Sequence, residues 1–344
     1  MSKQLTTYLK GIAIVLMVMH HSLTNPSWYV DGISNSYLYP YTDFLNRFGG
    51  FAVVPMFLFL TGWGYYFHED KSLTYSLKKI VTFLVDYWMV LFGIAALAYS
   101  LCDYKLTVAG MVQEMFSINN ELILFSWYVF LYIEVMLFLP YFSKYVACYD
   151  LKKTILLVLL MLAVMKIVTL LIAYLFTRES FLYTAVNRYF FRNSSIVVAG
   201  YLCAKYNVLD RLTEHLKIGG GTTRSYLLII GCAIFYNFIR MLGTINTGLF
   251  LCPIFIAALA ALNINYAAVR NKIMLLLGRY SMNTWFIHAL FFSESTRYVF
   301  QKYGFWLHDP ILSYLWILAV STCLSIPVTK LQNVLNTKIS RLFK

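Results

Sequence analysis

Residues 10–21 of this chain read Lys-Gly-Ile-Ala-Ile-Val-Leu-Met-Val-Met-His-His, an apolar run with a cation at one end and two imidazoles at the other. Lys10 and His21 are eleven residues apart, a spacing that leaves them about 20° from three whole helical turns. Both side chains are therefore expected on one face of a helix, about 16 Å apart along its axis, with His20 on another face. A polar stripe inside a membrane helix indicates a functional site. A snorkelling lysine and an interfacial histidine are the simpler alternatives.

The composition of the whole chain predicts a polytopic membrane protein of the all-α class. Of its 344 residues 60% are apolar and 12% are charged, whereas soluble domains carry about 25% charged residues. Apolar windows of membrane length predict about ten transmembrane helices, near residues 8–24, 48–67, 80–101, 125–142, 154–176, 188–205, 225–242, 248–267, 273–293 and 311–328.

The distribution of Lys and Arg predicts the orientation of these spans. One set of loops and tails carries 18 of the 28 basic residues, so the positive-inside rule places that set, with both termini, in the cytoplasm. The net charge of +13 is thus explained by topology and lipid contact, and we expect no nucleic-acid partner. The first apolar run lacks a cleavage site, so we expect it to be retained as a span.

The segments between the spans predict no second domain, so residues 1–344 are expected to form one integral membrane domain. Apolar residues recur at helical spacing in 108–116 and in 208–216, and predict short interfacial helices there. The tail, residues 329–344, has the same pattern and is expected to be a cytoplasmic amphipathic helix. The six cysteines have no CxxC spacing, and we expect no metal site.

A second polar stripe lies in the ninth predicted span. Ser281, Thr284, Trp285 and His288 fall at i, i+3, i+4 and i+7 and therefore share one face. Arg279 enters the same span from the predicted cytoplasmic side. A buried histidine bonded to a neighbour is the alternative for His288.

Four phrases of the sequence together resemble the acyltransferase 3 family of integral membrane acyltransferases. They run in order over nearly the whole chain: the stretch from Lys10 to His21, the phrase Gly-Gly-Phe-Ala-Val-Val-Pro-Met-Phe-Leu-Phe-Leu-Thr-Gly at 49–62, Trp127-Tyr128, and Gly278 to His288. The sequence departs from the family pattern at Lys10, where arginine is common, and after Lys78-Lys79, where Thr82 and Asp86 replace a second arginine and a proline. The basic contacts with the donor are therefore expected to differ.

The resemblance implies transfer of an acyl group, usually acetyl from cytoplasmic acetyl-CoA, to a hydroxyl of a cell-envelope or exported polysaccharide or glycolipid. On this basis His21 is the first choice for a general base, or for a covalent acyl carrier, and His288 is a second catalytic candidate. Lys10, Arg279, Lys78 and Lys79 are expected to hold the CoA phosphates or the developing charge, and no bound cofactor is expected.

Glu134 is open to two interpretations. It can orient a catalytic histidine, or, like Asp86, it can pair with a basic residue on a neighbouring span.

Two other classes of function remain open from the sequence. A carrier or polymerase of lipid-linked sugars would also have many spans, buried charges and an aromatic outer loop such as residues 28–41. The third class is an accessory subunit of a polysaccharide-synthesis machinery. In each case we expect the protein in the plasma or inner membrane, and a homo-oligomer is compatible with the pattern.

Overall fold

The computed structural model describes most of the chain and shows helices, with no strand, in the residues that it describes. These residues are 1–23, 41–177, 180, 183–185, 190, 192–216, 223–242, 248–262 and 268–342; among them, the side chains of 42–52, 192, 237, 239–242, 248–250 and 339–342 are not described. The predicted all-α class is therefore confirmed for this part of the chain.

Every predicted span overlaps one helix of the described residues. In chain order these helices are α1 (Lys3–Leu23), α2 (Thr42–Tyr66), α3 (Leu73–Leu101), α5 (Trp127–Ala147), α6 (Leu151–Leu175), α8 (Arg192–Lys205), α10 (Thr223–Leu242), α11 (Gly248–Ala260), α12 (Val269–His288) and α14 (Pro310–Leu342). The short elements are α4 (Val108–Met115), α9 (Val208–His215), η4 (Ala289–Phe291) and α13 (Arg297–Gly304).

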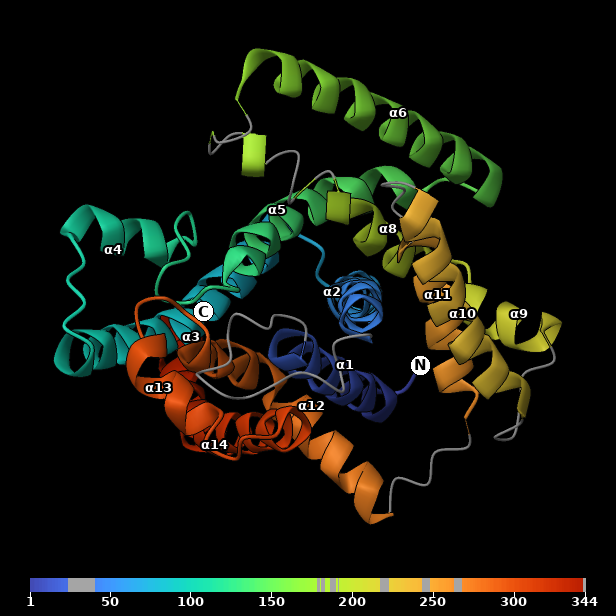
Figure 1. Cartoon of the computed structure of the whole chain (residues 1–344). Helices are drawn as coiled ribbons and strands as arrows, with labels where there is room; N and C mark the ends of the chain where they lie inside the picture. The colour runs from blue at the N-terminus through green and yellow to red at the C-terminus, as the bar shows by residue number, and fades with distance from the viewer. Residues whose placement is uncertain are drawn as a thin grey trace.

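By length and composition, 4 helices of the described residues can cross a membrane, namely α3, α5, α6 and Pro310–Lys338 of α14. The helices α1 and α12, which carry the predicted polar stripes, pack against each other and against α14. In Figure 1, α1 lies near the middle of the view, with α12 and α14 on one side and α2 on the other. The number of ten spans and the cytoplasmic termini stay predictions.

Two pairs of helices approach so closely that their glycines touch the partner backbone. A Cβ atom on Gly11 of α1 would lie 2.0 Å from the carbonyl oxygen of Met274, and one on Gly278 of α12 would lie 1.8 Å from that of Thr7. Gly62 of α2 and Gly200 of α8 repeat this arrangement against each other's helix. Such small-residue crossings let membrane helices pack by van der Waals contact.

The last helix extends through the predicted tail. Residues 329–342 are helical and continue α14 without a break, and their place in the cytoplasm stays a prediction. Polar contacts hold this part of α14 against the bundle, because the Gln332 side chain is 2% exposed. It exchanges two hydrogen bonds with Asn283 of α12, at 2.6 and 2.9 Å, and donates a third to the Asp86 carbonyl of α3.

The Asp86 carboxylate accepts a hydrogen bond from the Asn336 amide at 2.9 Å. Within the described residues its partner is therefore an amide of α14 and not the basic side chain that a buried carboxylate usually takes. An amide can satisfy a carboxylate oxygen without adding a second buried charge. The network joins α3, α12 and α14.

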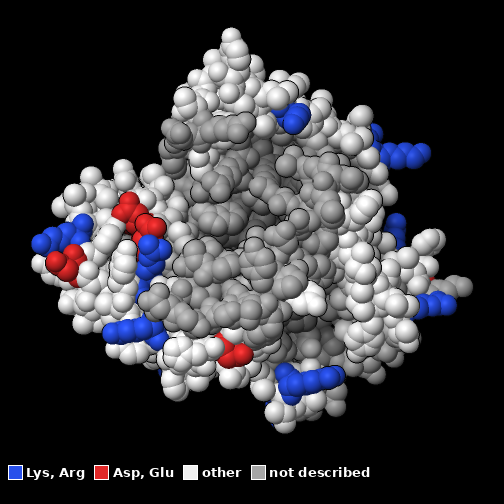
Figure 2. Space-filling model, viewed as in Figure 1, with Lys and Arg blue, Asp and Glu red and all other residues white. Residues whose placement is uncertain are grey.

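The short helix α4 forms as predicted, but its single carboxylate lies inward. Glu114 is fully buried, and its Oε1 accepts hydrogen bonds from the backbone N–H groups of Glu121 and Leu122 at 2.7 and 3.3 Å. Burial raises the pKa of the Glu114 carboxyl to about 7. Figure 2 shows acidic and basic side chains close together on the α4 side of this face, with further Lys and Arg side chains around the rest of its edge.

Candidate functional site

The structure brings the two histidines of the predicted stripes into contact. His21 lies two residues before the end of α1 at Leu23 in the sequence, and His288 is the last residue of α12. Nδ1 of His21 lies 2.8 Å from Nε2 of His288, across 267 residues of sequence. Both rings are almost parallel, with an angle of 6° between their planes.

The glycine crossing explains why these histidines meet. Tyr8 donates a hydrogen bond to the Asn271 side chain at 3.1 Å, so together with the glycine contacts it shows that α1 and α12 run in the same direction. Each histidine lies ten residues after the crossing glycine of its own helix, from Gly11 to His21 and from Gly278 to His288. Because both helices rise by about 1.5 Å per residue, equal spacings bring both imidazoles to the same level.

An aromatic ring covers one side of the histidine pair. The Phe125 ring stacks on His21 at 3.5 Å between centroids and 4° between planes, and lies 5.2 Å from the His288 ring. The backbone N–H of the preceding residue, Leu124, donates to the Ser293 hydroxyl at 3.0 Å. This hydrogen bond ties the segment before α5 to the segment after α12 and so holds Phe125 over the pair.

A cavity of about 220 Å³ lies between the two helices that carry the histidines and their neighbours, and contains the predicted cation. Its lining comes from α1, α2, α3, α5 and α12: Lys10, Met17, Val54, Phe57, Leu60, Thr61, Phe83, Tyr128, Tyr132, Ser281, Met282 and Trp285. Met17 lies one helical turn before His21, and Trp285 lies about one turn before His288. The cavity therefore extends along both helices from Lys10 toward the histidines, although neither histidine is part of its lining.

The other predicted basic residues lie outside this cavity. Arg279 and Lys79 are exposed and Lys78 is half-buried, and none of them contributes to the lining. The Lys79 ammonium lies 5.6 Å from the centre of the Tyr75 ring. Of the four cations assigned to donor binding, the structure places Lys10 alone in the lining of this cavity.

Glu134 is half-buried on α5. Its Oε2 atom is buried and has no hydrogen-bond partner among the described residues. The group that contacts Nδ1 of His288 is the Trp285 carbonyl, and the described contacts include none between Glu134 and either histidine. The two roles weighed for Glu134 therefore stay predictions.

Sequence reasoning did not identify Phe125 or the cavity residue Tyr132, and it included Thr61 only as part of the phrase at 49–62. Apolar and aromatic residues are common throughout the chain, so no local signal distinguishes those that reach the site. The Trp-Tyr phrase could have directed attention to this region, because Tyr128 lines the cavity and Phe125 lies three residues earlier. The aromatic residues 28–40 of the first outer loop lie outside the described residues.

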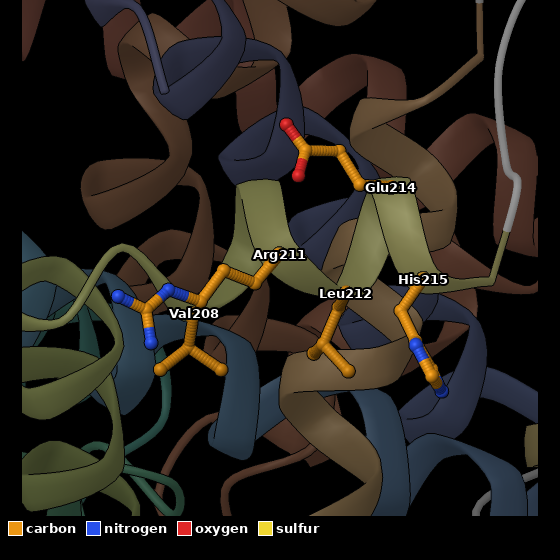
Figure 3. Close-up of a pocket in the computed structure, with 5 residues that line it drawn as sticks. All are labelled: Val208, Arg211, Leu212, Glu214 and His215. Carbon is orange, nitrogen blue, oxygen red and sulfur yellow. The ribbon is translucent and has the colours of Figure 1, made fainter.

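A second hollow lies on α9, away from the predicted site residues. It is an open groove of about 580 Å³ lined by Val208, Arg211, Leu212, Glu214 and His215. Figure 3 shows the Arg211, Glu214 and His215 side chains pointing in different directions from this one short helix. Because they do not converge, the groove offers no arrangement of groups comparable to the histidine pair.

Comparison with known protein families gives a match over most of the chain. The family model described as an acyltransferase domain matches residues 7–330, which include both histidines and every residue of the cavity. No curated protein and no solved structure matches the chain at a significant level. The match covers well over half of the sequence, and the chain therefore belongs to the acyltransferase 3 family.

Proposed function

We propose that this protein transfers an acyl group, most simply acetyl, from acyl-CoA to a hydroxyl of a cell-envelope or exported polysaccharide or glycolipid. The reaction would take place in the cell membrane, with His21 as the general base. Membership of the acyltransferase 3 family supports the reaction class. The contact between His21 and His288, next to a cavity that holds Lys10, is the observation that carries the assignment of residues.

The chemistry of the reaction requires a base. A sugar hydroxyl is a weak nucleophile while it keeps its proton, and a neutral imidazole can remove that proton as the oxygen attacks the thioester carbonyl. The C–S bond then breaks, and the protonated imidazole can return its proton to the leaving thiolate. His21 suits this task because one of its ring nitrogens contacts His288 and the other is available for the acceptor.

The size of the cavity suggests which part of acyl-CoA lies inside it and which part lies outside. A volume of about 220 Å³ is below the 300–1,000 Å³ of pockets that enclose drug-sized ligands. We therefore assign the cavity to the acyl group and the adjoining part of the pantetheine arm, with Lys10 beside the developing negative charge. The phosphates would lie outside the cavity, where Arg279, Lys78 and Lys79 are available.

The test uses membranes that contain the full-length chain and acetyl-CoA with a radioactive acetyl group. We expect the label to enter the carbohydrate or glycolipid fraction, and His21→Ala to lower its rate by about 10²-fold or more. His20→Ala is the matched control, with the amount of each variant in the membrane measured by immunoblot. Labelling that persists in the His21 variant would remove His21 as the base, and glycan movement without acetyl-CoA would indicate a carrier instead.

A further inference from the structure

We infer that His288 is a positioning residue that holds His21 in a single tautomer, with the proton on Nδ1 and the reactive lone pair on Nε2. The inference rests on the proposed function, because it specifies which atom of the base takes the hydroxyl proton. It is carried by a chain of three groups, the Trp285 carbonyl, the His288 ring and the His21 ring.

The first contact determines the tautomer of His288. Nδ1 of this ring is in hydrogen-bond contact with the Trp285 carbonyl oxygen, three residues earlier on α12. A carbonyl oxygen can only accept a hydrogen bond. The Nδ1 atom must therefore carry the proton, and the Nε2 atom of neutral His288 must carry a lone pair.

The second contact determines the tautomer of His21. Nε2 of His288 lies 2.8 Å from Nδ1 of His21, and two lone pairs at this distance would repel each other. Nδ1 of His21 must therefore donate a proton to the lone pair of His288. The opposite arrangement would require a proton on Nε2 of His288 and would leave its Nδ1 lone pair facing the Trp285 carbonyl.

What remains on His21 is the Nε2 lone pair. This lone pair lies in the plane of the ring, so the acceptor hydroxyl has to approach in that plane, while Phe125 stacks on one face. The proton leaves the hydroxyl for Nε2 as the oxygen–acyl bond forms, and it passes to the thiolate after the C–S bond breaks. While His21 is protonated, the bond from its Nδ1 to His288 becomes charge-assisted and therefore stronger.

The tautomer can be measured directly in the full chain. We would label the histidines with ¹⁵N, reconstitute the protein in nanodiscs and record imidazole nitrogen spectra, assigning His21 and His288 from the spectra of His21→Gln and His288→Gln. We expect a protonated Nδ1 and an unprotonated Nε2 for both rings. A protonated Nε2 on neutral His21 overturns the inference, whether or not the protein transfers acyl groups.

Kinetics provides the second measurement. We expect His288→Leu to lower kcat by about 10²-fold with an unchanged KM for acetyl-CoA, because the base loses its orientation while the donor keeps its contacts. His288→Gln should retain more activity, because its side-chain oxygen can still accept from Nδ1 of His21. His20→Gln is the matched control, and thermal unfolding reports whether each variant folds.

The outcomes separate this inference from the proposed function. If His21→Ala abolishes transfer but the Leu and Gln variants of His288 are both as active as the wild type, the proposed function stands and the positioning role is wrong. If His288→Leu does not fold, the spectrum of the wild-type protein still decides the tautomer, because the assignment then uses the Gln variants. If transfer itself is absent, the proposed function fails while the tautomer is still measured.

Discussion

Gly11 of α1 and Gly278 of α12 pack against each other's helix backbone, and each lies ten residues before one histidine of the His21–His288 pair. This relationship makes the distance between the two imidazoles depend on a crossing about 15 Å away along the helices. A change at the crossing should therefore affect the site without touching it.

The first prediction concerns this crossing. A methyl group on Gly278 would lie 1.8 Å from the Thr7 carbonyl oxygen, so Gly278→Ala must push the helices apart. We expect a loss of about 1–3 kcal/mol of stability and a large loss of transfer activity, measured by thermal unfolding in detergent and by acetyl labelling.

Gly93 provides the matched control for the crossing. It lies on α3, and a Cβ atom there would meet nothing within 4 Å. Gly93→Ala should therefore be neutral or slightly stabilising, because alanine favours helices over glycine by about 0.5–1 kcal/mol. Equal behaviour of the two variants would show that the close approach of α1 and α12 has no importance for activity.

The second prediction concerns the cation in the cavity. Lys10→Met keeps most of the length of the side chain and removes the charge. The protein should therefore bind the donor less tightly and stabilise the developing negative charge less. A hydrogen bond to a charged group contributes about 1.5–3 kcal/mol, which corresponds to a loss of about 10- to 150-fold in kcat/KM for acetyl-CoA.

Lys152→Met is the control for Lys10, since Lys152 is exposed at the start of α6. The same substitution there should leave kcat/KM for acetyl-CoA unchanged. If both variants behave like the wild type, Lys10 has no role in binding the donor, and the assignment of the cavity to the acyl group loses its charged contact.

The third prediction concerns the ring that covers the pair. Phe125→Leu retains apolar bulk but removes the stacking on His21, which lies 3.5 Å away between centroids. Aromatic stacking contributes about 0.5–1.5 kcal/mol beyond burial, so kcat should fall by about 2- to 12-fold. Phe116→Leu is the control, because Phe116 is 39% exposed and makes no described contact with either histidine.

The fourth prediction is a pH dependence of stability that originates in Glu114. Burial raises the pKa of this carboxyl from 4.5 to about 7 in the folded chain. Between these values the folded state holds the proton that the unfolded state has released, so stability should fall as the pH rises from about 4.5 to about 7. The full effect is about 3 kcal/mol, and it is absent below this range and complete above it.

Thermal unfolding across this pH range checks the role of Glu114. Glu114→Gln retains an oxygen for the two backbone N–H groups of residues 121 and 122 but cannot ionise, so its profile should be flatter than that of the wild type. Glu69→Gln, at an exposed position, should leave the profile unchanged. Parallel profiles for wild type and Glu114→Gln would contradict the prediction.

Helix positions could be predicted well from the sequence, whereas helix ends and partners could not. Each apolar window coincides with a helix because twenty apolar residues leave a backbone in lipid no other way to satisfy its N–H and C=O groups. The partners of the tail of α14 could not be predicted, because Gln332 and Asn336 are polar residues whose contacts lie on Asp86 and Asn283 of other helices.

For the candidate site, too, the positions along each helix could be predicted, whereas the contacts between helices could not. Periodicity along one helix placed Lys10 and His21 on a common face, and placed Ser281 and His288 on another. It could not show that these two faces meet, or that Phe125 covers the place where they do, since both facts depend on residues far apart in the chain.

The sequence by itself determined the helical class, the positions of the helices and the polar stripes of α1 and α12, because these follow from the repeat of side chains along a single helix. Only the tertiary structure decided that His21 contacts His288. The physical reason is that a hydrogen bond between two helices depends on their crossing point, which is set here by two glycines that have no side chain to keep the backbones apart.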